Sequence, residues 1–470
     1  MTMKRVIFVA VLVILIAGTI SVDAASTASS PAGEPWTLEH VDWYEGSHVG
    51  SHVSIAHHPK TGKAYISYYD SVNTALKMAH EVSPGTGNCG PGKAWECETV
   101  QSSTSVGKYT SIDVVYVPMN PVILSYTKIG ISFYDASAQR LRYAECSESI
   151  MQDCTWLVYN VDDSGDVNMS VGQYSSLKFD RDNVPHIAYH IEYTPGLFDY
   201  GGFKYATQVG GAAGNCIPEG DWDCEVVDTS EYPQHGTHIS LALYAGVSPR
   251  IAFYNAKFTG LETATRVSGD CTNSNWECEI IDDGYEDGTG VNHDVGKFAS
   301  LAYSGMVPLY AYYDATAGKW KYAAYNSTFD GNCTNSLYDC YQGDSIGMIS
   351  GEGHLGLSLA VDGQGLPVIA YMKVYTDGVK KLRVARPASA FGLEYGNCGD
   401  VPPGNLFQYW QCQTIDPGAS YADEADFAAV SVSPAGLATI AYSEYNSRDS
   451  ELYLKVARQH FAVYLPFIKK

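Results

Sequence analysis

Aromatic side chains recur at matching places along this chain, often next to a carboxylate. One set stands just before short segments that begin with Ser or Ala: His52, Tyr109, Tyr174, His238, Phe298 and Phe427. A second set ends the following segments: Tyr69-Asp70, Tyr134-Asp135, His190, Tyr254-Asn255 and Tyr313-Asp314. Aromatic faces stack on sugar rings or capture peptides, and neighbouring carboxylates accept hydrogen bonds from hydroxyl groups. The pattern therefore predicts ligand-binding positions at the aromatic and histidine members of both sets other than Phe427.

A structural explanation of the same pattern stays open, because Tyr can fill gaps between repeats and Asp can cap turns. Places where the pattern breaks are then of special interest. His190 and Glu444 replace the usual Asp region, and His354 lies in the atypical segment Gly351 to Gly356. We include these three residues among the candidate ligand-binding positions.

The sequence carries no strong catalytic signature. It has no nucleophile elbow, no H-E-x-x-H metal motif, no P-loop and no sialidase-type turns. A non-catalytic binding or scaffold function outside the cell, on a glycan or a protein, is the favoured interpretation. The alternative is a polysaccharide hydrolase or lyase, with a single acid such as Glu444 or Asp314 in a central pocket; it rests on fold-level analogy alone.

Two acidic loops could attract Ca²⁺. One runs from Asp162 to Asn168 with oxygen-bearing side chains at alternate positions, and the other runs from Asp282 to Asp294. Neither fits the full EF-hand pattern, which needs a Glu at its twelfth position. We expect no cofactor and no metal site, with Ca²⁺ kept as the open alternative.

Internal repeats indicate which elements position these residues. An apolar residue followed by a variable pair and an alanine occurs seven times, ending at Ala79, Ala144, Ala206, Ala264, Ala323, Ala385 and Ala457. Each copy follows two short alternating segments, and each of the first six copies precedes a third, with Gly, Pro, Asn and Asp between them. Period-two alternation with such turns predicts β-strands, and four strands per repeat predict a propeller. The expected fold is an all-β, seven-bladed β-propeller of four-stranded blades.

Twelve cysteines fall into pairs that are local in sequence. The pairs are Cys89 and Cys97, Cys146 and Cys154, Cys216 and Cys224, Cys271 and Cys278, Cys333 and Cys340, and Cys398 and Cys412. Zinc sites usually have tighter spacing, so we predict six disulfides, one in each blade built from a continuous stretch of chain. The first cysteine of a pair lies before the fourth strand and the second opens that strand.

The two ends of the repeat region complement each other. Trp36 to Asp42 looks like a fourth strand without the three that should precede it, and the last repeat lacks a fourth strand. We expect the N-terminal strand to join the last blade and close the ring. The propeller should then span residues 36–460, with a C-terminal tail at 461–470.

The N-terminus has the pattern of an export signal. Lys4 and Arg5 precede an apolar run, and small residues near Ala24 offer a cleavage site. We expect a signal peptide at 1–24, a flexible leader at 25–35, and a mature chain that is secreted or held at the cell surface without a membrane span. The net charge of −23 argues against a nucleic-acid partner, because binding phosphates requires Lys and Arg.

The repeat resembles a class of secreted bacterial propellers whose blades read S-L-A-x-D, P-x-I-A-Y-Y-D and L-K-Y-A. Matching stretches are Ser176-Leu177, Pro185 to Tyr189, Phe203 to Ala206, Ser358 to Asp362 and Pro367 to Tyr371. The resemblance covers nearly the whole mature chain and implies the fold without naming an activity. The tail Val463 to Lys470 is similar to short Y-L-P-x-I-basic ends of exported bacterial proteins, so it is either a surface-sorting signal or a short terminal strand.

Overall fold

A computed structural model defines the architecture. It describes residues 35–149, 154–196, 199–217, 220–285, 290–347, 356–375, 379–401, 408–416, 424–446 and 448–460. The expected signal peptide, leader and C-terminal tail lie outside these residues, apart from Pro35. No helix in the described part is long and apolar enough to cross a membrane.

The described chain forms seven antiparallel sheets of four strands each. Blade 1 comprises β2 (Val49–His57), β3 (Ala64–Asp70), β4 (Ala75–Glu81) and β5 (Trp95–Ser102). Blade 2 comprises β6 (Val106–Val117), β7 (Tyr126–Asp135), β8 (Arg140–Glu148) and β9 (Leu157–Asp162). Blade 3 comprises β10 (Met169–Phe179), β11 (Pro185–Tyr193), β12 (Tyr200–Gln208) and β13 (Trp222–Ser230). Blade 4 comprises β14 (Thr237–Tyr244), β15 (Ser248–Asn255), β16 (Gly260–Thr265) and β17 (Glu277–Asp282).

The remaining three blades follow the same plan. Blade 5 comprises β18 (Val295–Ser304), β19 (Val307–Asp314), β20 (Lys319–Tyr325) and β21 (Tyr338–Ser345). Blade 6 comprises β22 (Leu357–Val361), β23 (Pro367–Val374), β24 (Lys380–Pro387) and β25 (Trp410–Asp416). Blade 7 comprises β26 (Glu424–Val432), β27 (Ala438–Asn446), β28 (Glu451–Gln459) and β1 (Trp36–Asp42). Three short 3-10 turns, at Pro91–Lys93, Val122–Leu124 and Ala388–Phe391, lie in the connections.

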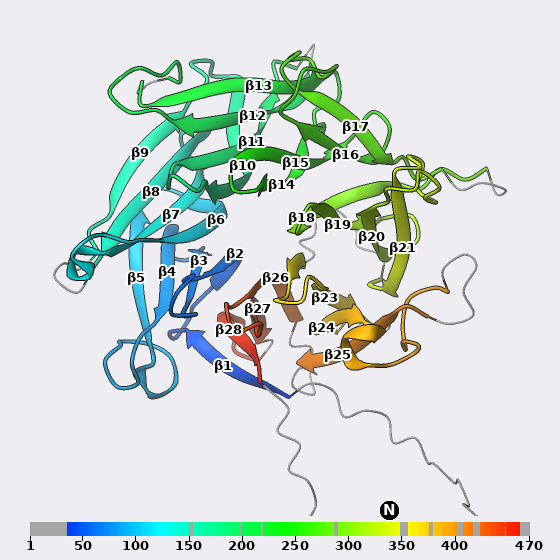
Figure 1. The fold of residues 1–470 in the computed structure, drawn as a ribbon. Coiled ribbons are helices and arrows are strands. Elements are labelled where there is room, and N and C mark those ends of the chain that lie inside the picture. The colour runs from blue at the N-terminus through cyan, green and yellow to red at the C-terminus, as the bar shows by residue number, and fades with distance from the viewer. Residues whose placement is uncertain are drawn as a thin grey trace, which may run out of the picture.

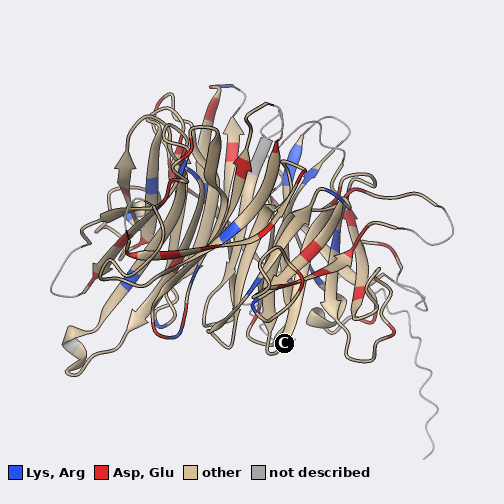
Figure 2. Cartoon of the chain, turned by 90° about the horizontal axis from the view of Figure 1, so that it is seen from above, with Lys and Arg blue, Asp and Glu red and all other residues tan. Residues whose placement is uncertain are grey.

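The blades are arranged in a ring around a central axis, with the first strand of each blade innermost (Figure 1). Neighbouring inner strands contact one another around the ring, from β2 and β6 through to β22, β26 and back to β2. The predicted seven-bladed propeller is therefore confirmed. Asp and Glu are spread over the molecule, with Lys and Arg among them (Figure 2).

The last blade is built from both ends of the described chain. β1 pairs antiparallel with β28, with Trp36 opposite Gln459 and Leu38 opposite Ala457. Val41 of β1 is fully buried beside Leu454 and Val456 of β28. Strand pairing and apolar packing thus hold together segments more than 400 residues apart.

Serines of the inner strands link successive blades. The Oγ atoms of six serines accept a hydrogen bond from a backbone N–H of the next blade at 2.9–3.2 Å: Ser54 from Ile112, Ser111 from Leu177, Ser176 from Leu241, Ser240 from Leu301, Ser300 from Leu359 and Ser358 from Val430. At the junction of blades 7 and 1 the matching residue is Ala429, which has no hydroxyl. There the His57 ring nitrogens lie 2.9 Å from Ser431 Oγ and 3.1 Å from Thr439 Oγ1.

A second inter-blade device is a tyrosine–carboxylate–cation triad. The tyrosine of a second strand donates to a carboxylate in the last two residues of the fourth strand of the preceding blade, and a third-strand cation pairs with the same carboxylate. The five triads are Tyr68–Asp42–Lys77, Tyr189–Asp162–Lys204, Tyr312–Asp282–Lys321, Tyr371–Asp344–Arg383 and Tyr442–Asp416–Lys455. At the other two junctions the tyrosine position holds Phe133 or Phe253.

All six predicted disulfides are confirmed, each with the expected partner. The bonds join Cys89 to Cys97, Cys146 to Cys154, Cys216 to Cys224, Cys271 to Cys278, Cys333 to Cys340 and Cys398 to Cys412. The second cysteine lies within the fourth strand or at its start in five blades, whereas Cys154 of blade 2 lies three residues before β9. Six disulfides indicate an oxidising, extracytoplasmic environment.

An asparagine before the first cysteine fixes the disulfide loop in four blades. Its side-chain Oδ1 accepts a hydrogen bond from the N–H of the second cysteine at 2.6–2.8 Å: Asn88 from Cys97, Asn215 from Cys224, Asn332 from Cys340 and Asn397 from Cys412. In blade 4 Asp270 takes the place of the asparagine and accepts from the N–H of Cys278 at 3.2 Å. The repeated Gly-Asn-Cys stretch of the sequence is therefore a loop-fixing device.

Candidate functional site

Six aromatic residues of the inner strands are held in left-handed backbone conformation. Their φ angles lie between 43° and 54°: His52, Tyr109, Tyr174, His238, Phe298 and Phe427. In all six of these blades the strand pairing slips around the aromatic residue. A bulge of this kind redirects a side chain, and bulky residues with positive φ are strained and cluster at functional sites. The same backbone conformation therefore recurs at this position in six of the seven blades.

These residues form an arc of touching rings, which we call the inner ring. The centroid separations are 5.0 Å for Phe427–His52, 4.7 Å for His52–Tyr109, 4.7 Å for Tyr109–Tyr174, 4.9 Å for Tyr174–His238 and 4.4 Å for His238–Phe298. Neighbouring planes are tilted by 46–58°. Every member is half-buried.

The matching position in blade 6 is Gly356, two residues before Ser358 just as Phe298 is two residues before Ser300. A Cβ there would stand 2.0 Å from the backbone N of Ala428, so no larger residue fits this backbone. The inner ring is therefore interrupted at blade 6. The candidate His354 belongs to this region and lies outside the described residues.

The second predicted set lies directly outside the first, and we call it the outer ring: Tyr69, Tyr134, His190, Tyr254 and Tyr313. Each packs edge-on against the inner-ring residue of its own blade, with centroids 6.0–6.4 Å apart. All five side chains are buried. The hydroxyls of Tyr134, Tyr254 and Tyr313 hydrogen-bond to Ser170, Asp294 and the carbonyl of Gly347. The outer ring therefore supports the inner ring.

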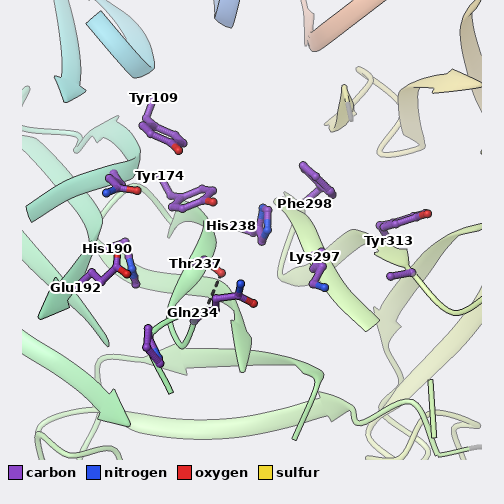
Figure 3. Close-up of a pocket in the computed structure, with 13 residues that line it drawn as sticks. Tyr109, Tyr174, His190, Glu192, Gln234, Thr237, His238, Lys297, Phe298 and Tyr313 are labelled. Carbon is purple, nitrogen blue, oxygen red and sulfur yellow. Dashed lines mark hydrogen bonds between the residues drawn. The ribbon is translucent and has the colours of Figure 1, made fainter. Parts of the chain in front are cut away.

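A cavity of about 680 Å³ opens beside the arc at blades 3, 4 and 5. Its lining comprises Tyr109, Gln173, Tyr174, His190, Glu192, Pro233, Gln234, Thr237, His238, Lys297, Phe298, Tyr313 and Ala315 (Figure 3). A smaller cavity of about 190 Å³ is lined by the inner-ring residues other than Phe427 and by residues one position further along the inner strands. We call the larger one the central cavity.

Polar groups of the central cavity come from the first two strands of each blade and from the link between blades 3 and 4. Thr237 Oγ1 donates to the carbonyl of Gln234 at 2.8 Å, which fixes that link (Figure 3). Gln173 donates to Ser170 at 3.2 Å, and Lys297 pairs with Asp294 at 2.6 Å. Amide, carboxylate and ammonium groups thus stand next to aromatic faces.

His190 is the outer-ring member that is not a tyrosine. Its side chain is buried, and burial lowers the pKa of His190 to about 4, so the imidazole is neutral at pH 7. Its Nδ1 has no hydrogen-bond partner among the described groups.

The structure brings together most of the predicted positions, although not all of them line the central cavity. Six of them line this cavity: Tyr109, Tyr174, His190, His238, Phe298 and Tyr313. Four others belong to the two rings without lining the cavity: His52, Tyr69, Tyr134 and Tyr254. Glu444 lies elsewhere: its carboxylate is 3.0 Å from the Lys455 ammonium, which also holds Asp416. Asp314 pairs with His293 at 2.7 Å.

Several lining residues escaped the sequence interpretation. Gln173, Thr237 and Lys297 occupy the variable position just before the inner-ring aromatic, where no repeated type gives a signal. Gln234 lies in an inter-blade link.

The sequence G-x-S-x-G, which can mark a catalytic serine, does occur once, from Gly343 to Gly347. It lies at the end of strand β21, and Ser345 Oγ donates to the carbonyl of Gly318 at 3.4 Å.

The junction of blades 3 and 4 has no triad. Two carboxyl groups at this junction, those of Asp228 and Glu262, have pKa values shifted in opposite directions. His235 contacts Asp228 at 2.9 Å; although burial opposes it, hydrogen bonds from His235 and Thr272 hold the pKa of Asp228 below its usual value. Glu262 takes the place of the triad lysine, and burial raises its pKa. Both residues line a cavity of about 540 Å³.

The two acidic loops considered for Ca²⁺ begin with triad residues. Asp162 is bound by Tyr189 and Lys204, and Asp282 by Tyr312 and Lys321. Over the described part of the chain, no group of three or more His, Cys, Asp or Glu side chains has the arrangement of a metal site.

Comparison with known proteins gave no match to a protein-family model and no match among curated proteins. Solved structures with a similar course of the chain include a protein of unknown function from Dyadobacter fermentans, 8% identical, with a TM-score of 0.44 over 91% of this chain and 100% of that chain. Another is a fucose-specific lectin from Aleuria aurantia, which is 9% identical and has a TM-score of 0.42 over 81% of this chain and 99% of the lectin. A third is an α-L-arabinofuranosidase from Fusarium graminearum, which is 9% identical and has a TM-score of 0.40 over 91% of this chain and 98% of that chain.

Proposed function

We propose that this protein is an exported, non-catalytic propeller that binds a glycan in the central cavity. The observation that carries the proposal is the position of Tyr174, half-buried between Tyr109 and His238 at the cavity wall. A sugar ring can stack on such a face while Gln173, Gln234 and Glu192 hydrogen-bond to its hydroxyls. The volume of about 680 Å³ is in the usual range of small-ligand sites.

Binding is favoured over hydrolysis by the carboxyl groups of the site. Glycoside hydrolysis generally needs two carboxyl groups flanking the scissile bond. Among the described residues that line the central cavity, Glu192 is the one carboxylate. The alternative hydrolase or lyase would turn over polysaccharides, so incubation with plant, fungal and bacterial polysaccharides and reducing-end detection separates the two functions.

A glycan array tests the proposal, with Tyr174→Ala as the site variant and Phe329→Ala as its control. Phe329 is 66% exposed and lies on the connection between β20 and β21, away from the cavity. We expect selective glycan binding that falls about tenfold or more in Tyr174→Ala and is unchanged in Phe329→Ala. An array without binding, or selective binding of peptides instead, would remove the proposal.

A further inference from the structure

A second cavity lies where the two ends of the propeller meet, and we call it the seam cavity. It has about 890 Å³ and is lined by His40, Trp43, Glu45, Gly46, Asn446, Asp449, Glu451 and Tyr453. The first four belong to β1 and to the link that follows it, and the last four to β27, β28 and their connection. It shares no described lining residue with the central cavity.

An exposed tryptophan is the most unusual feature of the seam cavity. The Trp43 side chain is 59% exposed, whereas Trp95, Trp222, Trp276, Trp320 and Trp410 are fully buried. Its ring lies edge-on to Tyr453, with centroids 6.2 Å apart and an interplanar angle of 76°. His40 contacts the same tyrosine at 5.5 Å with a tilt of 51°. Two exposed rings therefore flank Tyr453, which is 8% exposed.

The polar groups around these rings are fixed by hydrogen bonds. Tyr453 donates to Glu451 at 2.8 Å, and the N–H of Gly46 donates to the other oxygen of Glu451 at 2.6 Å. Asn446 donates its amide hydrogens to Asp449 at 3.1 Å and to the Tyr453 oxygen at 3.2 Å. The amide donors are thus used within the cavity wall.

The charge of the lining is one-sided. Glu45, Asp449 and Glu451 contribute three carboxylates, and none of the described lining residues is Lys or Arg. An anionic ligand would be repelled. A cation is attracted both by the carboxylates and by the electron-rich faces of Trp and Tyr, the combination that recognises alkylated ammonium groups in proteins.

The combination of an ammonium group, an aromatic ring and a carboxylate occurs repeatedly in the chain itself. In the triads an ammonium group lies over a tyrosine ring and against a carboxylate: Lys77 lies 5.6 Å from the Tyr68 centroid beside Asp42, and Lys455 lies 5.4 Å from the Tyr442 centroid beside Asp416. The seam cavity offers the aromatic faces and the carboxylates from its own side chains, without a Lys or Arg among the described residues of its lining.

We propose that the seam cavity binds an alkylammonium group, supplied by a quaternary headgroup such as choline or by a lysine side chain. The ligand contacts Trp43 and His40 from one end of the propeller and Asp449 from the other. Because it bridges the seam, binding favours the closed ring and raises the melting temperature as its concentration increases.

The test is a calorimetric titration at pH 8, where exposed imidazole is neutral. The probes are choline, N-acetyl-lysine amide, dimethylbutanol (the uncharged isostere of choline) and methyl glycosides. We expect the better of the two cations to bind at least about tenfold more tightly than the uncharged isostere, and to protect Trp43 from fluorescence quenching by acrylamide. If choline binds more tightly than N-acetyl-lysine amide, the ligand is a quaternary ammonium group. If N-acetyl-lysine amide binds more tightly, the ligand is a primary ammonium group.

Matched variants locate the site. Trp43→Ala and Asp449→Asn should each weaken cation binding, Trp43→Ala by about tenfold, while Phe329→Ala and the central-cavity variant Tyr174→Ala should not change it. Equal binding of choline and its isostere, preferential binding of a methyl glycoside, or unchanged affinity in Trp43→Ala would overturn the proposal. Since Tyr174→Ala affects only the central cavity, failure here and failure of the proposed glycan site are distinguishable.

Discussion

The hydroxyl of Tyr68 donates a hydrogen bond of 2.6 Å to the carboxylate of Asp42, and this contact joins blade 1 to the N-terminal strand of blade 7. Lys77 pairs with the same carboxylate. Burial and the neighbouring Asp42 raise the pKa of Tyr68 well above its usual value, so the hydroxyl remains a donor at all physiological pH values. Four further junctions repeat the arrangement.

Replacing Tyr68 by Phe should remove that hydrogen bond without changing the packing, because Phe133 and Phe253 occupy the same strand position in blades 2 and 4. A buried hydrogen bond to a charged group contributes about 1.5–3 kcal/mol. We expect the free energy of unfolding, measured with denaturant, to fall by about that amount. The exposed Tyr232→Phe serves as the control, and equal stability of the two variants would show that the triad does not fasten the ring.

Glu262 occupies the triad-lysine position in blade 4, and its effect on stability should depend on pH. Burial raises the pKa of its carboxyl, opposed by the hydrogen bond from Asn255. A carboxyl whose folded pKa lies above its unfolded value binds its proton more tightly in the folded state. Its contribution is therefore favourable below the unfolded pKa and is lost as the pH rises through the folded pKa.

Glu262→Gln should accordingly stabilise the protein at pH 7, and the gain should disappear below about pH 4. Denaturant unfolding at both pH values measures it, with the exposed Glu277→Gln as the matched control. A stability gain that does not depend on pH, or a loss at pH 7, would contradict the assignment of a destabilising ionised carboxylate at this junction.

Closure through β1 can be tested by deletion. Without residues 25–42 the outer edge of β28 loses its partner, and an unpaired strand edge promotes association. We expect oligomers or aggregates in size-exclusion chromatography with light scattering, and a lower melting temperature. Deletion of residues 25–34 alone keeps β1 and should leave both unchanged. A monomeric 25–42 deletion variant with an unaltered melting temperature would show that the ring does not depend on β1.

The fold could be read from the sequence because each blade repeats the same chemistry in the same order. The alanine of the third strand, the Ser or Ala of the first and the paired cysteines are each needed in nearly every blade, so the copies reinforce one another. The triads could not be found in this way. Each involves Asp42, Asp162 or another carboxylate that contacts the next blade, and sequence periodicity does not show which side chains meet across a junction.

The candidate site was predictable only in its repeated part. Tyr109, Tyr174, His238 and Phe298 stand at one repeat position, and the structure places them side by side at the cavity. The sequence did not show which aromatic residues contact a ligand and which, such as the buried Tyr254, only support a neighbouring ring. Both positions require an aromatic side chain. The residues that differ between blades, such as Gln173 and Lys297, decide which ligand fits, and a repeat pattern gives no information about positions that vary.

Glycan binding in the central cavity is tested most directly by a crystal structure of the protein with the glycan that binds most tightly on the array. We expect a sugar ring stacked on Tyr174, with its hydroxyls hydrogen-bonded to Gln173, Gln234 or Glu192 in the central cavity. A glycan seated elsewhere on the propeller, with the inner ring uncovered, would contradict it.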